Sequence, residues 1–131
     1  MELNSKSMQV IRIPTALNSE LFDYWFHFME PFHHLTDREM EVAGQYAWKR
    51  YQLLKMEPDP DIVDEAMQKE DVRAQIREAA GVTPAHYQVI LGKFRKAKVL
   101  LGNKFNPRFM PSIVEEEGTF KLLLVFDFRN H

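Results

Sequence analysis

Residues 71–100 read DVRAQIREAAGVTPAHYQVILGKFRKAKVL, and this stretch decides the fold. In its first third, apolar residues recur at the three- and four-residue spacing of a helix, and they are Val72, Ile76, Ala79 and Ala80. Gly81 follows directly, at the position where helices commonly end on a residue in the left-handed conformation. The pattern therefore predicts a helix over residues 71–80 that ends at Gly81.

A second helix is predicted immediately after this glycine. Thr83 is a natural N-cap and Pro84 is a natural first helical residue, because proline has no amide hydrogen to satisfy there. One continuous apolar stripe follows, formed by Tyr87, Ile90, Leu91, Phe94 and Ala97. We expect this helix to run to about Lys98. Two helices joined by a short turn form the layout of a helix-turn-helix, in which the second helix lies in the major groove of DNA.

An aromatic-rich helix is predicted near the start of the chain. Over residues 18–29 the apolar side chains keep helical spacing, and Pro31 marks the end of the pattern. Tyr24 and Phe28 point away from the side that carries Trp25, so the aromatic residues cover more than one face of the helix. We expect part of this aromatic surface to meet a partner.

The best helix start in the chain is at Thr36. Its hydroxyl is placed to accept from a backbone N–H three residues on, while Glu39 reaches back to the Thr36 N–H, which makes a capping box. A helix of about five turns is expected from here to a point before Pro58. Residues 57–70 carry six acids against one lysine and predict a solvated connector with a short helix from Asp61.

The paired helices resemble the second half of sigma-factor region four and of LuxR-type regulators. The features that carry this resemblance lie in residues 76–100 and are the Ala-Gly-Val-Thr turn, the Tyr87 and Ile90 stripe, and the basic ending Phe94-Arg95-Lys96. Residues 35–54, which begin LTDRE, are similar to the opening of the same domains. The resemblance implies a non-enzymatic, helix-turn-helix-like protein that binds nucleic acid in a regulatory or packaging role.

The resemblance also implies which residues contact nucleic acid. His86 and Gln88, on the exposed side of the second helix, are the candidates for contacts to base edges. The candidate phosphate contacts on or beside that helix are Lys93, Arg95, Lys96 and Lys98. In a winged helix, the hairpin after the recognition helix touches the DNA backbone, and the candidates there are Lys104 and Arg108. The alternative interpretation of all these residues is an ordinary solvated surface on a core helix.

Strand-forming segments flank the helical part of the chain. Residues 8–13 alternate apolar and polar side chains and end before a proline, which predicts a short strand or an extended arm. Residues 99–107 predict a short strand and a turn. Residues 119–128, TFKLLLVFDF, form the clearest strand pattern and follow Gly118. We expect the last two segments to pair as a β-hairpin across a long loop, in the order of a winged helix.

These elements together predict one α+β domain over residues 1–131. Its parts are an N-terminal strand or arm with the aromatic helix (1–34), a helix-turn-helix-like core (35–98) and a strand-forming, winged-helix-like tail (99–131). A chain of this length that is 45% hydrophobic and 27% charged buries a substantial core without disulfides or metals.

Charge is unevenly distributed along the chain. Between Asp71 and Pro111 there are eight Lys or Arg residues and two acids, although the whole chain has a net charge of −2. A basic region of this kind suits phosphate binding. The pI is about 6.2, whereas DNA-binding domains usually have a pI above about 9. The same segregation of charge therefore also suits contacts between subunits.

Several classes of function receive no support from the sequence. The chain has no cysteine, which suits a reducing compartment, and it lacks both a secretory leader pattern and an apolar run long enough to cross a membrane. The histidines His27, His33 and His34 have no further ligand at a suitable spacing. The acidic run at 115–117 and the glycines form no catalytic or phosphate-binding signature. We expect no enzyme activity, metal, cofactor or small-molecule substrate.

A structural subunit of a larger assembly is the alternative function. The combination of a small helical unit with an aromatic arm is similar to small virion and connector proteins of tailed phages. In that case the helices would pack against neighbours, while the arm and residues 119–128 would extend a partner's sheet. Protein partners or self-association are expected, and the expected location is the bacterial cytoplasm or, for a viral protein, the virion.

Overall fold

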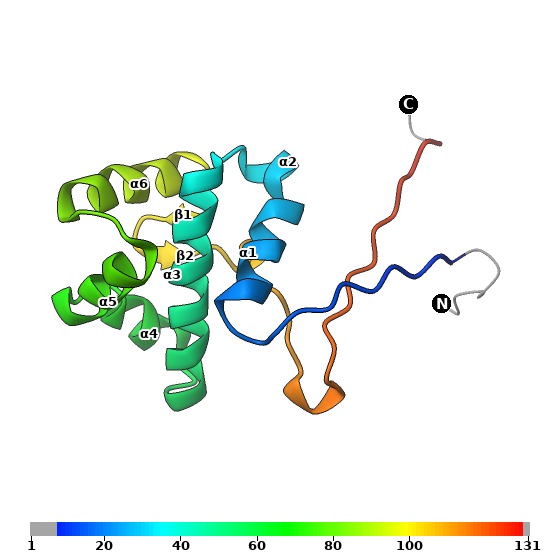
Figure 1. Ribbon diagram of the computed structural model, residues 1–131, viewed down its shortest axis with the longest axis horizontal. Coiled ribbons are helices and arrows are strands. Elements are labelled where there is room, and N and C mark those ends of the chain that lie inside the picture. The colour runs from blue at the N-terminus through cyan, green and yellow to red at the C-terminus, as the bar shows by residue number, and fades with distance from the viewer. Residues whose placement is uncertain (1–7, 130–131) are drawn as a thin grey trace.

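The structure is a computed structural model that describes residues 8–129, so residues 1–7 and 130–131, the outermost parts of the predicted arm and tail, lie outside the described residues. The helices of the described part are α1 (Ser19–Phe28), α2 (Glu30–His33), α3 (Asp37–Met56), α4 (Pro60–Ala66), α5 (Glu70–Ala80) and α6 (Pro84–Lys96). Helix α3 is central, with α1 and α2 on one side of it and α4, α5 and α6 on the other (Figure 1).

Helix α1 confirms the predicted aromatic helix. The Asn18 side chain accepts a hydrogen bond from the Glu20 N–H at 2.8 Å and caps its first turn. The buried aromatic residues of α1 are Phe22, Trp25 and Phe26. Tyr24 and Phe28 lie on another face and are each 46% exposed. The predicted division of the aromatic residues between two faces is therefore confirmed.

Helix α3 begins with the predicted capping box. The Glu39 N–H donates to the Thr36 hydroxyl at 3.2 Å, and the Thr36 N–H donates to the Glu39 carboxylate at 3.0 Å. Gly44 lies where α3 crosses α1, and a Cβ atom there would be 3.2 Å from the Asp23 backbone nitrogen. The missing side chain thus allows the two helices to pack closely.

The prediction of a solvated connector over residues 57–70 is wrong in its central part. The short helix predicted from Asp61 is confirmed by α4, but its residues Val63 and Asp64, with Met67 after it, are buried and not solvated. The Arg50 guanidinium donates to both Asp64 carboxylate oxygens, at 2.7 and 3.3 Å. The number of acidic residues predicted a solvated segment. Asp64 is buried instead because its carboxylate pairs with Arg50, 14 residues earlier in the chain, and local sequence does not reveal this pairing.

Helices α5 and α6 confirm the two helices predicted within residues 71–98 and the turn between them. Gly81 has a φ of 67° and ends α5 in the left-handed conformation, as predicted. The Thr83 hydroxyl accepts from the His86 N–H at 3.1 Å and caps α6. Helix α6 ends at Lys96, two residues earlier than expected, and Lys98 takes up a left-handed conformation with a φ of 64°.

A short hairpin follows α6, but its partners differ from those predicted. Strand β1 (Leu100–Leu101) pairs antiparallel with β2 (Lys104–Phe105), with Gly102 at a φ of 66° in the turn. The expected pairing of residues 99–107 with 119–128 is therefore wrong. A two-residue turn brings β2 onto β1 directly, so the first segment completes a hairpin by itself.

After the hairpin, residues 107–120 pass across the α1 side of the body, and we call this segment the root. It contains the 3-10 turns η2 (Pro107–Phe109) and η3 (Glu115–Glu117). The buried Trp25 indole N–H donates to the Phe109 carbonyl at 2.9 Å. The same indole meets the Phe120 ring edge-on, with ring centroids 5.5 Å apart. Trp25 therefore holds both ends of the root.

Glu115 fastens the middle of the root to α3. The Tyr51 hydroxyl donates to its carboxylate at 2.7 Å, and the Lys55 ammonium lies 2.9 Å from the same oxygen. Burial, together with the neighbouring Glu115 carboxylate, raises the pKa of Tyr51 to about 12, whereas Lys55 and Tyr51 lower the pKa of Glu115. These contacts fix the root against the helical body.

The segments before α1 and after the root are extended and project from the body (Figure 1). We call residues 8–17 the arm and residues 121–129 the tail. The arm is extended as one of its two predicted forms, but it is not a strand. The predicted strand over 119–128 is wrong for this chain by itself, since its described residues make only one isolated bridge, between Val114 and Thr119. Strand formation needs a neighbouring backbone, which the tail does not have.

One apolar core runs through the helical body, and the fold is mostly helical with one small antiparallel sheet, in agreement with an α+β class. The core includes residues from every helix except α2, and from both strands. Its largest fully buried side chains are Tyr46, Tyr87, Phe22, Phe26, Phe94, Met67, Ile90 and Leu91. The arm and tail contribute none of the core residues.

Candidate functional site

The outer side of α6 is the first candidate surface. We call it the α6 face, and its exposed residues are His86, Gln88, Val89, Gly92, Lys93 and Lys96. They are exposed because Tyr87, Ile90, Leu91 and Phe94 turn toward the core on the opposite side of the helix. No acidic residue occurs in the sequence between Glu78 and Glu115. The α6 face thus combines two lysines and two polar side chains with no acid of its own helix.

The lysines of the α6 face carry unpaired charge. Neither Lys93 nor Lys96 makes an ion pair with any residue of the described range 8–129. The turn before α6 is held from α3, because the Arg38 guanidinium donates to the Gly81 carbonyl at 2.8 Å. The position of the α6 face is therefore fixed by the hydrogen-bonded turn before α6 and by the packing of α6 on the core.

The other predicted basic residues serve the local fold. Arg95 donates to the Gly102 carbonyl at 3.1 Å and to the Asn103 side chain at 3.2 Å, so it holds the turn between β1 and β2. Lys98 lies in the link after α6, and its carbonyl accepts from the Asn106 side chain at 2.8 Å. The Arg95 side chain is thus used by the fold, whereas Lys98 contributes only its backbone carbonyl and lies beyond the end of α6.

Lys104 and Arg108 are placed apart from the α6 face by their contacts. The Lys104 ammonium is 3.2 Å from the Asp61 carboxylate on α4. The Arg108 guanidinium lies over the ring of Phe32, 5.1 Å from its centroid, on the α1 and α2 side of the molecule. The structure therefore brings four of the eight predicted contact residues, His86, Gln88, Lys93 and Lys96, onto one face.

The arm and the tail form the second candidate surface. Large apolar side chains of the tail are exposed by 47 to 81%, and they are Leu122, Leu123, Leu124, Val125, Phe126 and Phe128. The arm adds Met8, Val10, Ile11 and Ile13, which are exposed by 44 to 86%. Such a concentration of exposed apolar side chains is typical of a surface that another molecule covers.

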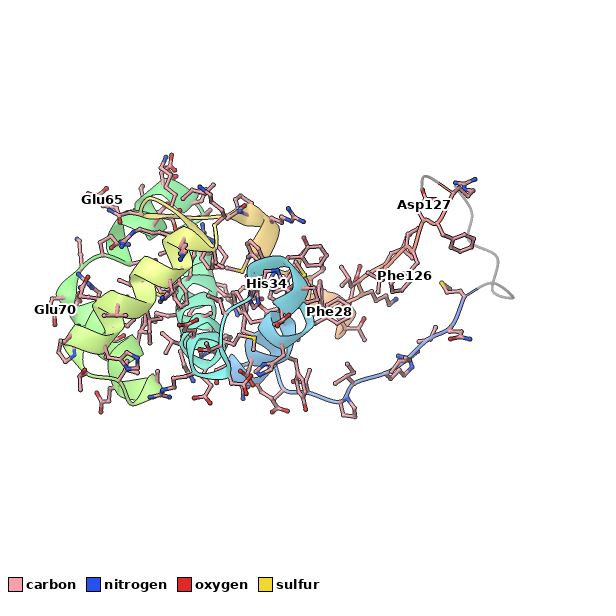
Figure 2. The ribbon with its side chains drawn as sticks, turned by 90° about the horizontal axis from the view of Figure 1, so that it is seen from above. Phe28, His34, Glu65, Glu70, Phe126 and Asp127 are labelled. Atoms are coloured by element: carbon pink, nitrogen blue, oxygen red, sulfur yellow. The ribbon has the colours of Figure 1, made fainter. Side chains whose placement is uncertain are left out.

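Exposed aromatic rings lie on the body near the second surface. Tyr24 and Phe28 on α1, and Phe32 on α2, are each about half exposed. Figure 2 places Phe28 on the side of the body from which the tail projects, with Phe126 and Asp127 well out along the tail. The second surface is therefore on the opposite side of α3 from the α6 face (Figure 1).

Two of the three histidines considered as metal ligands, His27 and His33, have other partners. His33 is buried, with its ring nitrogens 2.7 Å from the Phe26 carbonyl and 2.9 Å from the Leu35 N–H. His27 contacts the Asp23 backbone and side chain. Residues 8–129 contain no group of three or more His, Cys, Asp or Glu that could hold a metal ion. The helices of this range also include none that is long and apolar enough to cross a membrane.

Comparison with known protein families, curated proteins and solved structures finds no match to this chain. The functional argument therefore rests on the two surfaces. The sequence located the α6 face through the capped helix and its basic end. It did not reveal that residues 121–126 have no strand partner within the described part of the chain, although the unbroken apolar run LLLVF at 122–126 is typical of a strand that is buried on both faces.

Proposed function

We propose that this protein is a non-enzymatic structural subunit of a larger assembly, in which the helical body is held in place by its arm and tail. The observation that carries the proposal is the tail, an extended and largely apolar segment that projects from the body with its side chains exposed. A setting in a bacterial cell or a virion suits this role. The tailed-phage resemblance of the sequence points the same way.

The contrast between root and tail supports this role. Trp25 and Glu115 fix the root to α1 and α3 up to Phe120. Beyond that point the next nine residues are exposed without exception. A fixed root directs the tail away from its own body, and an extended segment of this length spans about 30 Å. The tail is thereby presented to a neighbouring molecule.

The energetics favour burial of the tail in an assembly. Its apolar side chains leave several hundred Å² of surface in water, taking about 150–250 Å² for each aromatic ring alone, and burial releases about 25 cal/mol per Å². Among residues 8–129, no surface covers these side chains. Association with other subunits removes this exposed area from water.

The test compares the wild-type chain with a tail variant, Leu124→Asp/Phe126→Asp, by light scattering after size exclusion. We expect the wild type to associate above its 15.5 kDa monomer mass, and the tail variant to run as a monomer, because two buried carboxylates oppose association. The matched control is Met56→Asp/Val89→Asp, which changes two exposed apolar residues of the body. We expect the control to associate like the wild type.

A folded wild-type chain that stays monomeric across the whole concentration range would contradict the proposal. Loss of association in the control as well would show that the added charge, and not the tail, is responsible. Circular dichroism of all three proteins establishes that each retains the helical body.

A second function, nucleic-acid binding, is favoured by the α6 face. Lys93 and Lys96 make no ion pair within the described residues, His86 and Gln88 are available for polar contacts, and the helix follows α5 after a short turn at Gly81. Two lysines provide a small footprint, so we expect weak binding that depends on salt. This second role is compatible with an assembly that handles DNA, because the α6 face and the tail lie on opposite sides of α3 (Figure 1).

The test of the second function is fluorescence anisotropy of duplex DNA at increasing salt. We expect affinity to fall as salt rises, and a Lys93→Glu/Lys96→Glu variant to lose at least about tenfold, because phosphate contacts supply most non-specific affinity. The control, Lys49→Glu/Lys69→Glu, makes the same charge change outside α6. Equal losses in both variants would point to net charge alone, and absence of binding at low salt would refute the second function.

A further inference from the structure

We propose that the tail of one chain pairs as a β-strand with the arm of a second copy of the same chain. This inference rests on the proposed assembly function and names the partner of the tail. The described structure has no backbone pairing between arm and tail of one chain. The two segments cross in Figure 1 but are well separated in Figure 2, so they diverge within the single chain.

The backbone of both segments suits strand pairing. Arm and tail are extended over residues 8–13 and 121–128, without helical or strand hydrogen bonds of their own. Pro14 has no amide hydrogen, so it ends the length of arm that a strand can use. The described part of the arm before Pro14, residues 8–13, is six residues long, about 20 Å, and fits within the tail's longer span. Pairing would satisfy backbone groups of both segments at once.

The side-chain pattern of the tail gives it two different faces. Side chains alternate between the faces of a strand, and the even-numbered tail residues, Leu122, Leu124, Phe126 and Phe128, are all apolar. On the odd-numbered face, the charged residues Lys121, Asp127 and Arg129 lie toward the two ends of the tail, with Leu123 and Val125 between them. The even-numbered face thus suits burial against the body of a neighbouring chain, and the odd-numbered face carries its charges toward the two ends of the strand.

The area available points to a second copy as the partner. The exposed apolar side chains of one arm and one tail amount to on the order of 1,000 Å², taking about 150–250 Å² for each of the two aromatic rings and less for each aliphatic side chain. A stable interface buries about 800 Å² on each partner. When two copies exchange these segments, the tail of each copy pairs with the arm of the other. Both segments of the interface are therefore present in every copy. Association by mutual exchange requires no other protein.

The absence of cysteine in the sequence allows a direct test by cross-linking. Two versions of the chain are expressed together, one with only Ile11→Cys in the arm and the other with only Leu123→Cys in the tail. The Ile11 and Leu123 side chains are 86% and 63% exposed. After co-expression and mild oxidation, mass spectrometry measures the mixed disulfide dimer. We expect this arm–tail dimer to exceed, by at least about fivefold, the dimer formed when Gln52→Cys on α3 replaces the arm cysteine.

The possible outcomes separate this inference from the proposed function. Association without the arm–tail disulfide would overturn the arm as partner while leaving the assembly function in place. A dominant disulfide between two tails would do the same. A monomer in solution would overturn both. A chain that carries both cysteines and closes the disulfide within itself at high dilution would show intrachain pairing and would also overturn the exchange between copies.

Discussion

The helical body and the tail contain similar apolar residues but treat them in opposite ways. Phe22 in α1 is completely buried, whereas Phe126 in the tail is 81% exposed. In the body, apolar residues recur at helical spacing, so each helix has one face to bury and α3 provides the surface that covers it. In the tail, the run at 122–126 is apolar on both strand faces and has no second strand. The helices therefore complete one core within the described chain, whereas the apolar residues of the tail lie outside that core and are available for an interface.

The largest expected effect separates the two regions by stability. Phe22→Ala removes a ring that packs against Trp48 and Tyr51, with centroids 5.9 and 5.6 Å away. We expect it to lower the free energy of unfolding by about 4 kcal/mol, the usual range for loss of a buried aromatic side chain. Phe126→Ala should change it by less than about 0.5 kcal/mol, because a solvated ring loses no packing.

Urea unfolding of both variants, at a protein concentration low enough to keep the chain monomeric, measures this difference. Light scattering at high concentration supplies the converse, since only Phe126→Ala is expected to weaken association without loosening the body. A large stability loss from Phe126→Ala in the monomer would show that the tail packs on its own body and would remove the contrast.

The next expected effect uses one substitution, glycine to alanine, at two helical positions. At Gly44 a new Cβ atom would lie 3.2 Å from the Asp23 nitrogen and 3.3 Å from its Cα, so α1 and α3 must separate slightly. We expect Gly44→Ala to destabilise the body by about 2 kcal/mol. At Gly92, on the α6 face, a Cβ atom meets nothing within 4 Å. Gly92→Ala should therefore stabilise α6 by up to about 1 kcal/mol.

Thermal unfolding followed by circular dichroism checks both values in one experiment. Gly92→Ala also serves as a control for the α6 face, because it should leave DNA binding unchanged if the face contacts phosphates through Lys93 and Lys96. A stabilising Gly44→Ala would mean that the crossing of α1 and α3 has room for a methyl group, contrary to the close approach of their backbones.

The helices were predictable because their signals are local. The capping box at Thr36, the left-handed Gly81 and the Thr83 cap with Pro84 are set by residues within three or four positions of one another. The solvated connector and the long hairpin were wrong because burial and strand pairing depend on distant partners. The buried Asp64 carboxylate is paired with Arg50, 14 residues earlier in the chain. Strands β1 and β2 pair with each other, so residues 119–128 have no strand partner within the described chain.

The candidate site was predictable to a smaller extent. The helical stripe of α6 predicted that His86 and Gln88 lie on its exposed side, and they do, together with Lys93 and Lys96 from the larger set of predicted phosphate contacts. The charge pattern did not indicate which basic side chains the fold itself would use. Lys104 pairs with an acid on another helix and Arg108 packs over an aromatic ring, and neither contact follows from spacing in the sequence.

The smallest expected effect compares a buried histidine with an exposed one. Burial lowers the pKa of His33 below its ordinary value of 6.5, although its hydrogen bond to the Phe26 carbonyl opposes this. The neutral ring suits its surroundings, because one nitrogen donates to that carbonyl while the other accepts from the Leu35 N–H. As pH falls through about 6.5, His33 takes up a proton more readily in the unfolded chain than in the folded one. Stability is therefore full above this pH and declines below it, until the folded pKa is reached.

Urea unfolding between pH 7.5 and 5.5 measures the decline, which one histidine limits to about 1.4 kcal/mol per pH unit. In a His33→Gln variant we expect the slope of stability against pH to become shallower by this histidine's share, whatever the variant's stability at pH 7.5. His86→Gln makes the same substitution on the exposed α6 face and controls for the substitution itself. An unchanged slope in His33→Gln would show that the buried ring does not resist protonation, and that the body tolerates a charge beside Phe26 as readily as the exposed surface does.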